Sequence, residues 1–148
     1  MGQEYVFGAV LLLANKLQVW GEGLVDELTM KQWFLLVFIS RMTTPRPSVT
    51  QVAEFTGTSR QNTKKMLALL DAQGFVDLAP STSDGRALSV GLTDKTWACF
   101  ADNQARAVQA AAALFEGVTD EDLAGAVHTL EHLLAVLGNP PLDQAGLR

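Results

Sequence analysis

One segment, Ser48–Val76, constrains the fold of this chain more than any other: SVTQVAEFTGTSRQNTKKMLALLDAQGFV. Ser48 and Gln51 form a capping-box pattern, which is typical of a helix that begins at the serine. Gly57 supplies the permissive backbone of a tight turn, and Ser59 is a good N-cap for a second helix. The segment therefore predicts two helices joined by a turn of about three to four residues, which is a helix-turn-helix.

The second helix opens on side chains of the kinds that contact phosphates and base edges in DNA: Ser59, Arg60, Gln61, Asn62, Lys64 and Lys65. Arg60 can pair bidentately with guanine, and Gln61 or Asn62 with adenine. Lys64 and Lys65 are suited to neutralising phosphates. The leading serine can cap the helix or bond a phosphate. The alternative, a solvated polar face on an ordinary helix, is disfavoured by the helix and turn that precede these residues.

The charge of the chain is unevenly distributed. Its net charge is −5, which argues against a general electrostatic attraction to DNA. Between Arg41 and Arg86, however, there are six basic and four acidic residues, whereas the remainder holds five basic and twelve acidic residues. A local basic footprint on an acidic body fits a protein that contacts DNA with one face only.

Apolar periodicity predicts further elements on both sides of the helix-turn-helix. A helix over about residues 3–20 carries one apolar stripe, and a second helix begins at Thr29. The run 33–39 is apolar on all sides, so this second helix is expected at the centre of the core. The strand-like segments 75–80 and 88–92 flank a polar loop and predict a β-hairpin.

Two long helices follow the hairpin. Thr93 is expected to cap an alanine-rich helix that extends to about Phe115. Thr119 is expected to cap a last helix, which carries leucines and valines along one face. The predicted fold is thus mainly α with a small β-hairpin. A chain with 48% apolar residues forms a core readily, but one of this size cannot easily cover both terminal stripes itself. Burial against a second copy is the simple solution, so a homodimer is expected.

The order of these elements and three segments together resemble the MarR family, the multiple-antibiotic-resistance regulators, which are winged-helix transcription factors. The segments are LTMKQWFLL at 28–36, the helix-turn-helix quoted above, and SDGRALSVGLT at 83–93. The last resembles the Asp-x-Arg of the family's wing, followed by a strand and a Leu-Thr that begins the next helix. The resemblance extends from the first helix to about Gly138.

The resemblance implies one MarR-like chain over residues 1–148. The winged helix-turn-helix region would span about 29–92, and dimerisation helices about 3–24 and 93–138. The end, 139–148, is expected to be a frayed tail. The resemblance also implies that the protein is a sequence-specific DNA-binding regulator and a ligand-responsive repressor. It would act as a homodimer on a pseudo-palindromic operator of double-stranded DNA.

In the wing, Arg86 is expected to reach the minor groove, where narrow A·T-rich steps attract arginine. Asp84 would orient its guanidinium or hold the hairpin tip; a surface salt bridge without function is the alternative. Asp77 and Leu78 depart from the family, which often has a basic residue there, and this predicts a weaker wing contact. The family implies a small aromatic or phenolic effector between the winged region and the dimer helices.

Aromatic residues could line such a pocket or simply fill the core, and the sequence leaves both open: Trp20, Trp33, Phe34 and Phe38. No cofactor, no enzymatic activity and no membrane partner are expected, and the single cysteine fits the reducing cytoplasm. A winged-helix module for protein–protein contact without DNA is the main alternative function.

Two minor signals remain. His128, Glu131 and His132 spell H-x-x-E-H, an inverted zinc-peptidase motif, which would make the protein a zinc hydrolase. A partly exposed polar face beside the leucine stripe is the favoured interpretation, so no metal site is expected. Cys99 is interpreted as a small buried apolar thiol, because a redox switch needs an exposed, electropositive setting.

Overall fold

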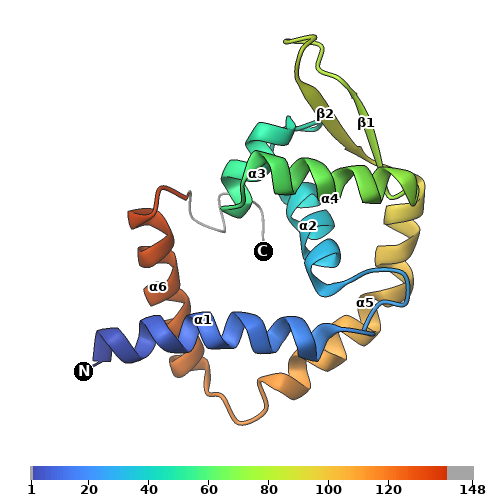
Figure 1. The fold of residues 1–148 in the computed structure, drawn as a ribbon. Coiled ribbons are helices and arrows are strands. Elements are labelled where there is room, and N and C mark those ends of the chain that lie inside the picture. The colour runs from blue at the N-terminus through green and yellow to red at the C-terminus, as the bar shows by residue number, and fades with distance from the viewer. Residues whose placement is uncertain (1, 140–148) are drawn as a thin grey trace.

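The computed structural model describes residues 2–139, which form six helices and one two-stranded antiparallel hairpin (Figure 1). In chain order the elements are α1 (Gly2–Gly21), α2 (Met30–Arg41), α3 (Val49–Thr56), α4 (Arg60–Ala72), β1 (Val76–Pro80), β2 (Leu88–Leu92), α5 (Asp94–Leu114) and α6 (Asp120–Val136). The mainly helical fold with a hairpin is confirmed. Of the expected tail at 139–148, all but the first residue lies outside the described part.

The predicted capping residues begin the helices where the sequence placed them. Thr29 and Ser48 each form a complete capping box, and the Ser59 hydroxyl accepts the Asn62 N–H at 3.2 Å. Thr93 differs: it stands at the N-cap of α5, but its hydroxyl makes no capping bond there and donates instead to the Gly74 carbonyl at 2.6 Å. It thereby joins the start of α5 to the end of α4.

The hydrophobic core lies where α2, α3, α4 and the base of the hairpin meet. Its largest contributions come from Leu36, Val52, Leu67, Leu70, Phe75 and Val90, all of which are fully or almost fully buried. Helix α2 was predicted to be buried on all sides, but only one side, which carries Leu35, Leu36 and Ile39, is buried in the core. Phe34, on the other side, is 42% exposed and faces the hollow described below.

One leucine of α4 lies outside the core: Leu69 is 53% exposed. Leu67 and Leu70 share the buried face at a spacing of three, and the 3.6-residue period turns the intervening Leu69 away from them.

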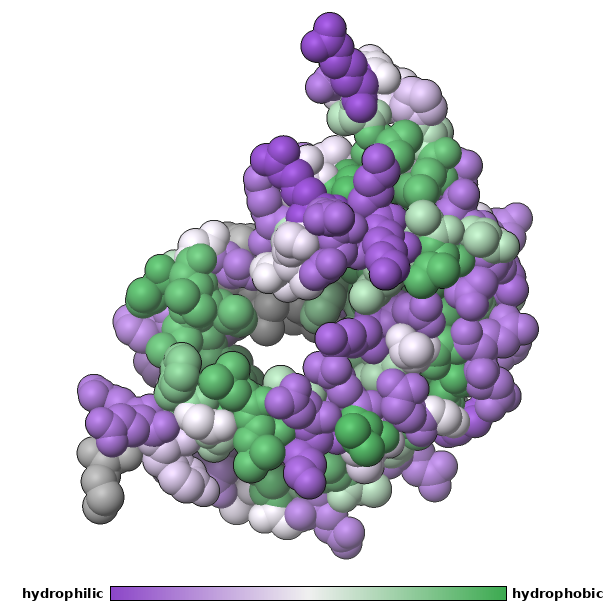
Figure 2. Space-filling model, viewed as in Figure 1, coloured by the Kyte–Doolittle hydropathy of each residue, from purple (hydrophilic) through white to green (hydrophobic). Residues whose placement is uncertain are grey.

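The terminal helices leave much apolar surface uncovered within the chain. Figure 1 shows α1 and α6 on the side away from the hairpin, and Figure 2 shows hydrophobic side chains gathered there around a hollow. No residue of α6 is buried. The exposed apolar side chains of α1 and α6 include Tyr5, Phe7, Leu11, Leu12, Leu13, Leu123, Val127, Leu130 and Leu133. Among residues 2–139, no helix has the length and apolarity that crossing a membrane requires.

Candidate nucleic-acid interface

A short hydroxyl cluster fixes the turn between α3 and α4. Gly57 ends α3 with φ of +67°, a conformation that glycine adopts without strain. The hydroxyls of Thr56 and Thr58 lie 2.6 Å apart, and the buried Thr63 hydroxyl donates to Thr58 at 3.4 Å. These threonines were not singled out in the sequence, because their role depends on how the two helices cross. Together they hold the start of α4 against the end of α3.

All the residues predicted to contact DNA on α4 lie at its exposed N-terminal half. They flank the buried Thr63, and the next turns bury Leu67 and Leu70 in the core. Within the described residues, the side chains of Arg60, Lys64 and Lys65 have no hydrogen-bond or ion-pair partner. Helix α4 is therefore anchored in the core, and its first two turns carry exposed cationic and amide groups. Groups of these types bind phosphates and base edges.

The hairpin forms a wing that projects beside α4 (Figure 1). Its register pairs Val76 with Leu92 and Pro80 with Leu88. At the tip, the Asp84 carboxylate accepts the backbone N–H of Arg86 at 3.0 Å. This bond closes the hairpin tip, and Arg86 is exposed there.

The base of the wing contains an ion pair that the sequence did not reveal. The Asp77 carboxylate lies 3.0 Å from the guanidinium of Arg46, a residue of the loop between α2 and α3. The carboxylate of Asp77, the residue that departs from the family pattern, is therefore paired with a neighbouring cation.

Lys95 joins the end of α4 to two other elements. Its ammonium donates to the Gln73 carbonyl at 2.9 Å, pairs with Glu27 at 3.2 Å and lies 4.4 Å from the centre of the Phe75 ring. A cation at a helix C-terminus interacts favourably with the helix dipole and with the unpaired carbonyls. Because these partners come from distant parts of the chain, helical periodicity alone did not indicate this role.

The two minor signals of the sequence lie on α5 and α6. Burial, followed by the negative charge of Glu27, raises the pKa of the half-buried Cys99 thiol, which is the opposite of what a redox switch requires. His128 and His132 lie exposed on α6, and within residues 2–139 no three His, Cys, Asp or Glu side chains are grouped so as to hold a metal ion.

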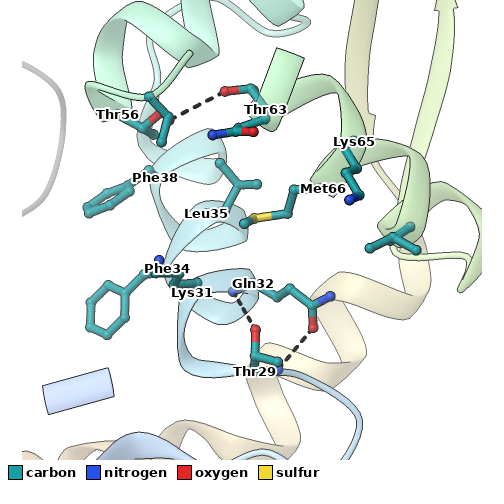
Figure 3. A pocket seen from close by; sticks show the side chains of 13 residues that line it. Thr29, Lys31, Gln32, Phe34, Leu35, Phe38, Thr56, Thr63, Lys65 and Met66 are labelled. Atoms are coloured by element: carbon teal, nitrogen blue, oxygen red, sulfur yellow. Dashed lines mark hydrogen bonds between the residues drawn. The ribbon is translucent and has the colours of Figure 1, made fainter. Parts of the chain in front are cut away.

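Two cavities border the winged region. One of about 520 Å³ lies between α2 and α4, where Leu35 and Met66 point toward each other (Figure 3). The other, of about 840 Å³, lies among α1, α2 and α5. All four aromatic residues that the sequence left open between pocket and core line the larger cavity: Trp20, Trp33, Phe34 and Phe38. Trp33 also packs edge to face on Phe100, so it serves the core as well.

Comparison with known proteins agrees with this geometry. Residues 27–87 match the sequence profile described as the MarR family. The chain is 30% identical over 132 residues to the transcriptional activatory protein BadR of Rhodopseudomonas palustris, covering 85% of this chain and 73% of that protein.

Solved structures share the fold over most of their length. A probable transcriptional regulator from Pseudomonas aeruginosa is 25% identical, with a TM-score of 0.67 and coverage of 88% of this chain and 96% of that one. The transcriptional regulator SlyA superposes with a TM-score of 0.76 at 14% identity, covering 89% and 93%. BpsR of Bordetella bronchiseptica superposes with a TM-score of 0.72 at 19% identity, and the match covers 85% of this chain and 91% of that one. The chain belongs to the MarR family and is a DNA-binding transcriptional regulator, not an enzyme.

Proposed function

We propose that the protein reads a specific operator by inserting the start of α4 into the major groove and the wing tip into the adjacent minor groove. The observation that carries this proposal is the free polar cluster at the start of α4, held in place by the Ser59 cap and the buried Thr63. Arg60, Gln61 and Asn62 read bases, whereas Lys64 and Lys65 contact phosphates. Arg86 enters the minor groove from the wing.

The acting species in this proposal is a homodimer. Apolar side chains are exposed on α1 and α6 and, at and after the end of α5, at Leu114, Phe115 and Val118. Large exposed apolar surfaces of this kind mark contacts between proteins. A two-fold dimer covers this surface and places two α4 helices about 34–36 Å apart, one turn of DNA. The operator is then pseudo-palindromic. Such a protein acts where its DNA lies, which we take to be the cytoplasm.

A small aromatic or phenolic effector fits the larger cavity. This cavity lies between α2 of the winged region and the terminal helices, and its lining is mostly apolar. BpsR, with the same fold, has its DNA binding regulated by 6-hydroxynicotinic acid. An effector here shifts the spacing of the α4 helices only to the extent that it binds one arrangement more tightly than the other.

Repression is the proposed direction of regulation, and the family resemblance supports it. Activation is the second candidate, because the relative from Rhodopseudomonas palustris is described as an activatory protein. A reporter joined to the operator, with and without the protein, separates these directions by the sign of the change in expression.

Gel shift against the DNA upstream of the protein's own gene, at a series of salt concentrations, tests the DNA-binding proposal. We expect a specific shift in which the logarithm of the binding constant falls linearly with the logarithm of salt concentration, because bound phosphates release counterions. The absence of salt-dependent binding above that of unrelated DNA would favour the alternative, a winged-helix module that contacts proteins only.

A further inference from the structure

The segment before α3 runs along β2 of the wing and makes an isolated β-bridge to it. The backbone N–H of Val90 donates to the Pro47 carbonyl at 2.9 Å, and Ser48 forms an antiparallel bridge with Ser89. Continuing this register places Arg46 beside Gly91. Since Gly91 is itself the partner of Asp77 in the hairpin, the three residues form one row across this segment and the two strands of the wing.

The Arg46 side chain spans this row and touches both strands of the wing. Its guanidinium donates to the Asp77 carbonyl at 3.2 Å and to the Asp77 carboxylate at 3.0 Å. Its Nε donates to the Ser89 hydroxyl at 3.4 Å, and that hydroxyl donates onward to the Ala79 carbonyl at 3.2 Å. One side chain from the start of the helix-turn-helix therefore bonds β1 and β2 together.

The guanidinium keeps this position only because the residue that it crosses is a glycine. A Cβ added to Gly91 would lie 2.2 Å from Nη1 of Arg46 and 2.9 Å from its Cζ, far inside contact distance. Only the mobile end of an arginine stands in the way, so an alanine at this position would displace the guanidinium and leave the backbone in place. Arg46, Gly91 and Asp77 thus form one unit, which we call the wing brace.

We propose that the wing brace positions the wing for DNA, with Arg46 as a positioning residue that sets where Arg86 meets the minor groove. An isolated two-stranded hairpin is only marginally stable in water. The Arg86 tip lies at the far end of such a hairpin, so small changes at the base move it furthest. Through the hydrogen bonds of Arg46, the wing brace joins the base of the hairpin to the segment that leads directly into α3. This inference rests on the proposed contact between Arg86 and DNA.

The decisive experiment is a double-mutant cycle on operator affinity, measured by fluorescence anisotropy with the full chain. In the natural background we expect Arg86→Ala to weaken binding about tenfold, as for the loss of one good groove contact. Gly91→Ala, which keeps every charge, should weaken binding to a similar extent. In the Gly91→Ala background, Arg86→Ala should then cost less than about twofold, because coupled residues are not additive.

Two further variants complete the cycle. Arg46→Ala should reproduce Gly91→Ala, and combining the two should add nothing, because both remove the same contacts. Arg106→Ala on α5 is the charge-matched control and should change affinity by less than about twofold, its only described ion pair being a 3.9 Å contact with Asp26. Melting temperatures should stay within a few degrees of the natural protein, since exposed ion pairs contribute little to stability.

Hydroxyl-radical footprinting supplies a readout that global stability does not affect. In Gly91→Ala the minor-groove protection opposite the wing should fade while the major-groove contacts of α4 persist. A full effect of Arg86→Ala in the Gly91→Ala background would overturn the inference alone, showing that Arg86 acts without the brace. A silent Arg86→Ala in the natural background would overturn the proposed wing contact, and the inference with it.

Discussion

At the scale of single residues, the cationic side chains of the DNA-facing surface differ in how much freedom they keep. Arg60 and Lys65 project from α4 without partners in the described part of the chain, so they can adapt to bases and phosphates. Arg46 is fixed by two strands of the wing. The sequence predicted the first kind correctly as exposed, because exposure follows from helical period. It missed the second, because Arg46 and Asp77 lie 31 positions apart.

The division of labour along α4 leads to the first prediction. Arg60→Ala should relax base preference at one position of the operator, with a cost of about 1–3 kcal/mol on the preferred sequence. Lys65→Ala should weaken all sequences alike and reduce the salt slope by about one unit. Affinities for the operator and for single-base variants, measured at several salt concentrations, check both. Equal loss of specificity from the two substitutions would contradict these assignments.

Cys99 provides a second prediction at this scale. Because burial and Glu27 raise the pKa of its thiol, less thiolate is present at neutral pH than in an ordinary cysteine. Alkylation by iodoacetamide at pH 7.5 should therefore be slower in the folded protein than in the urea-unfolded chain. The raised pKa also means that the stability contributed by the protonated thiol is lost as pH rises through the pKa of this thiol in the folded protein. Faster alkylation of the folded protein would contradict this assignment.

At the scale of secondary-structure elements, local signals predicted most of the fold. The capping serines and threonines, and the glycines after α3 and α4, act within a few residues of themselves, so the sequence shows them directly. Signals that depend on packing were less complete. The Thr93 hydroxyl donates to the Gly74 carbonyl instead of capping α5, because the arrangement of neighbouring elements decides which acceptor it reaches.

The third prediction concerns Ser59, where two substitutions distinguish helix capping from DNA contact. Ser59→Ala should reduce the free energy of unfolding by about 1 kcal/mol, since it removes the bond to Asn62. Ser59→Asp keeps a capping oxygen and should retain stability, but it should weaken operator binding because it brings a negative charge near phosphates. Urea unfolding and anisotropy together check this pair. Unchanged DNA affinity in Ser59→Asp would show that this end of α4 lies away from the DNA.

At the scale of the whole molecule, the two ends of the chain and its centre have different surfaces. The winged region has a buried core and a polar outer face, whereas α1 and α6 expose apolar side chains around a hollow (Figure 2). The sequence predicted stripes that the chain cannot cover, and the structure shows them uncovered. The size and position of the larger cavity followed only from the way α1, α2 and α5 meet.

The uncovered surface leads to the fourth prediction. Leu130→Glu on α6 should shift the protein from dimer to monomer at micromolar concentration, because it places a charge within the proposed interface. The fold of the winged region should persist, since Leu130 is 42% exposed in the single chain. His128→Glu, on the same helix, is the matched control and should remain dimeric. Light scattering of the natural protein as a monomer would contradict the proposed assembly.

Selection of bound DNA from a random pool tests the central claim most directly, because it examines base reading, dimer symmetry and half-site spacing together. We expect enrichment of one pseudo-palindromic sequence, with half-sites about 10–10.5 base pairs apart and A·T-rich steps at the positions reached by the wings. Recovery of no enriched sequence, or of a single asymmetric half-site, would contradict a dimer that reads its operator with two copies of α4.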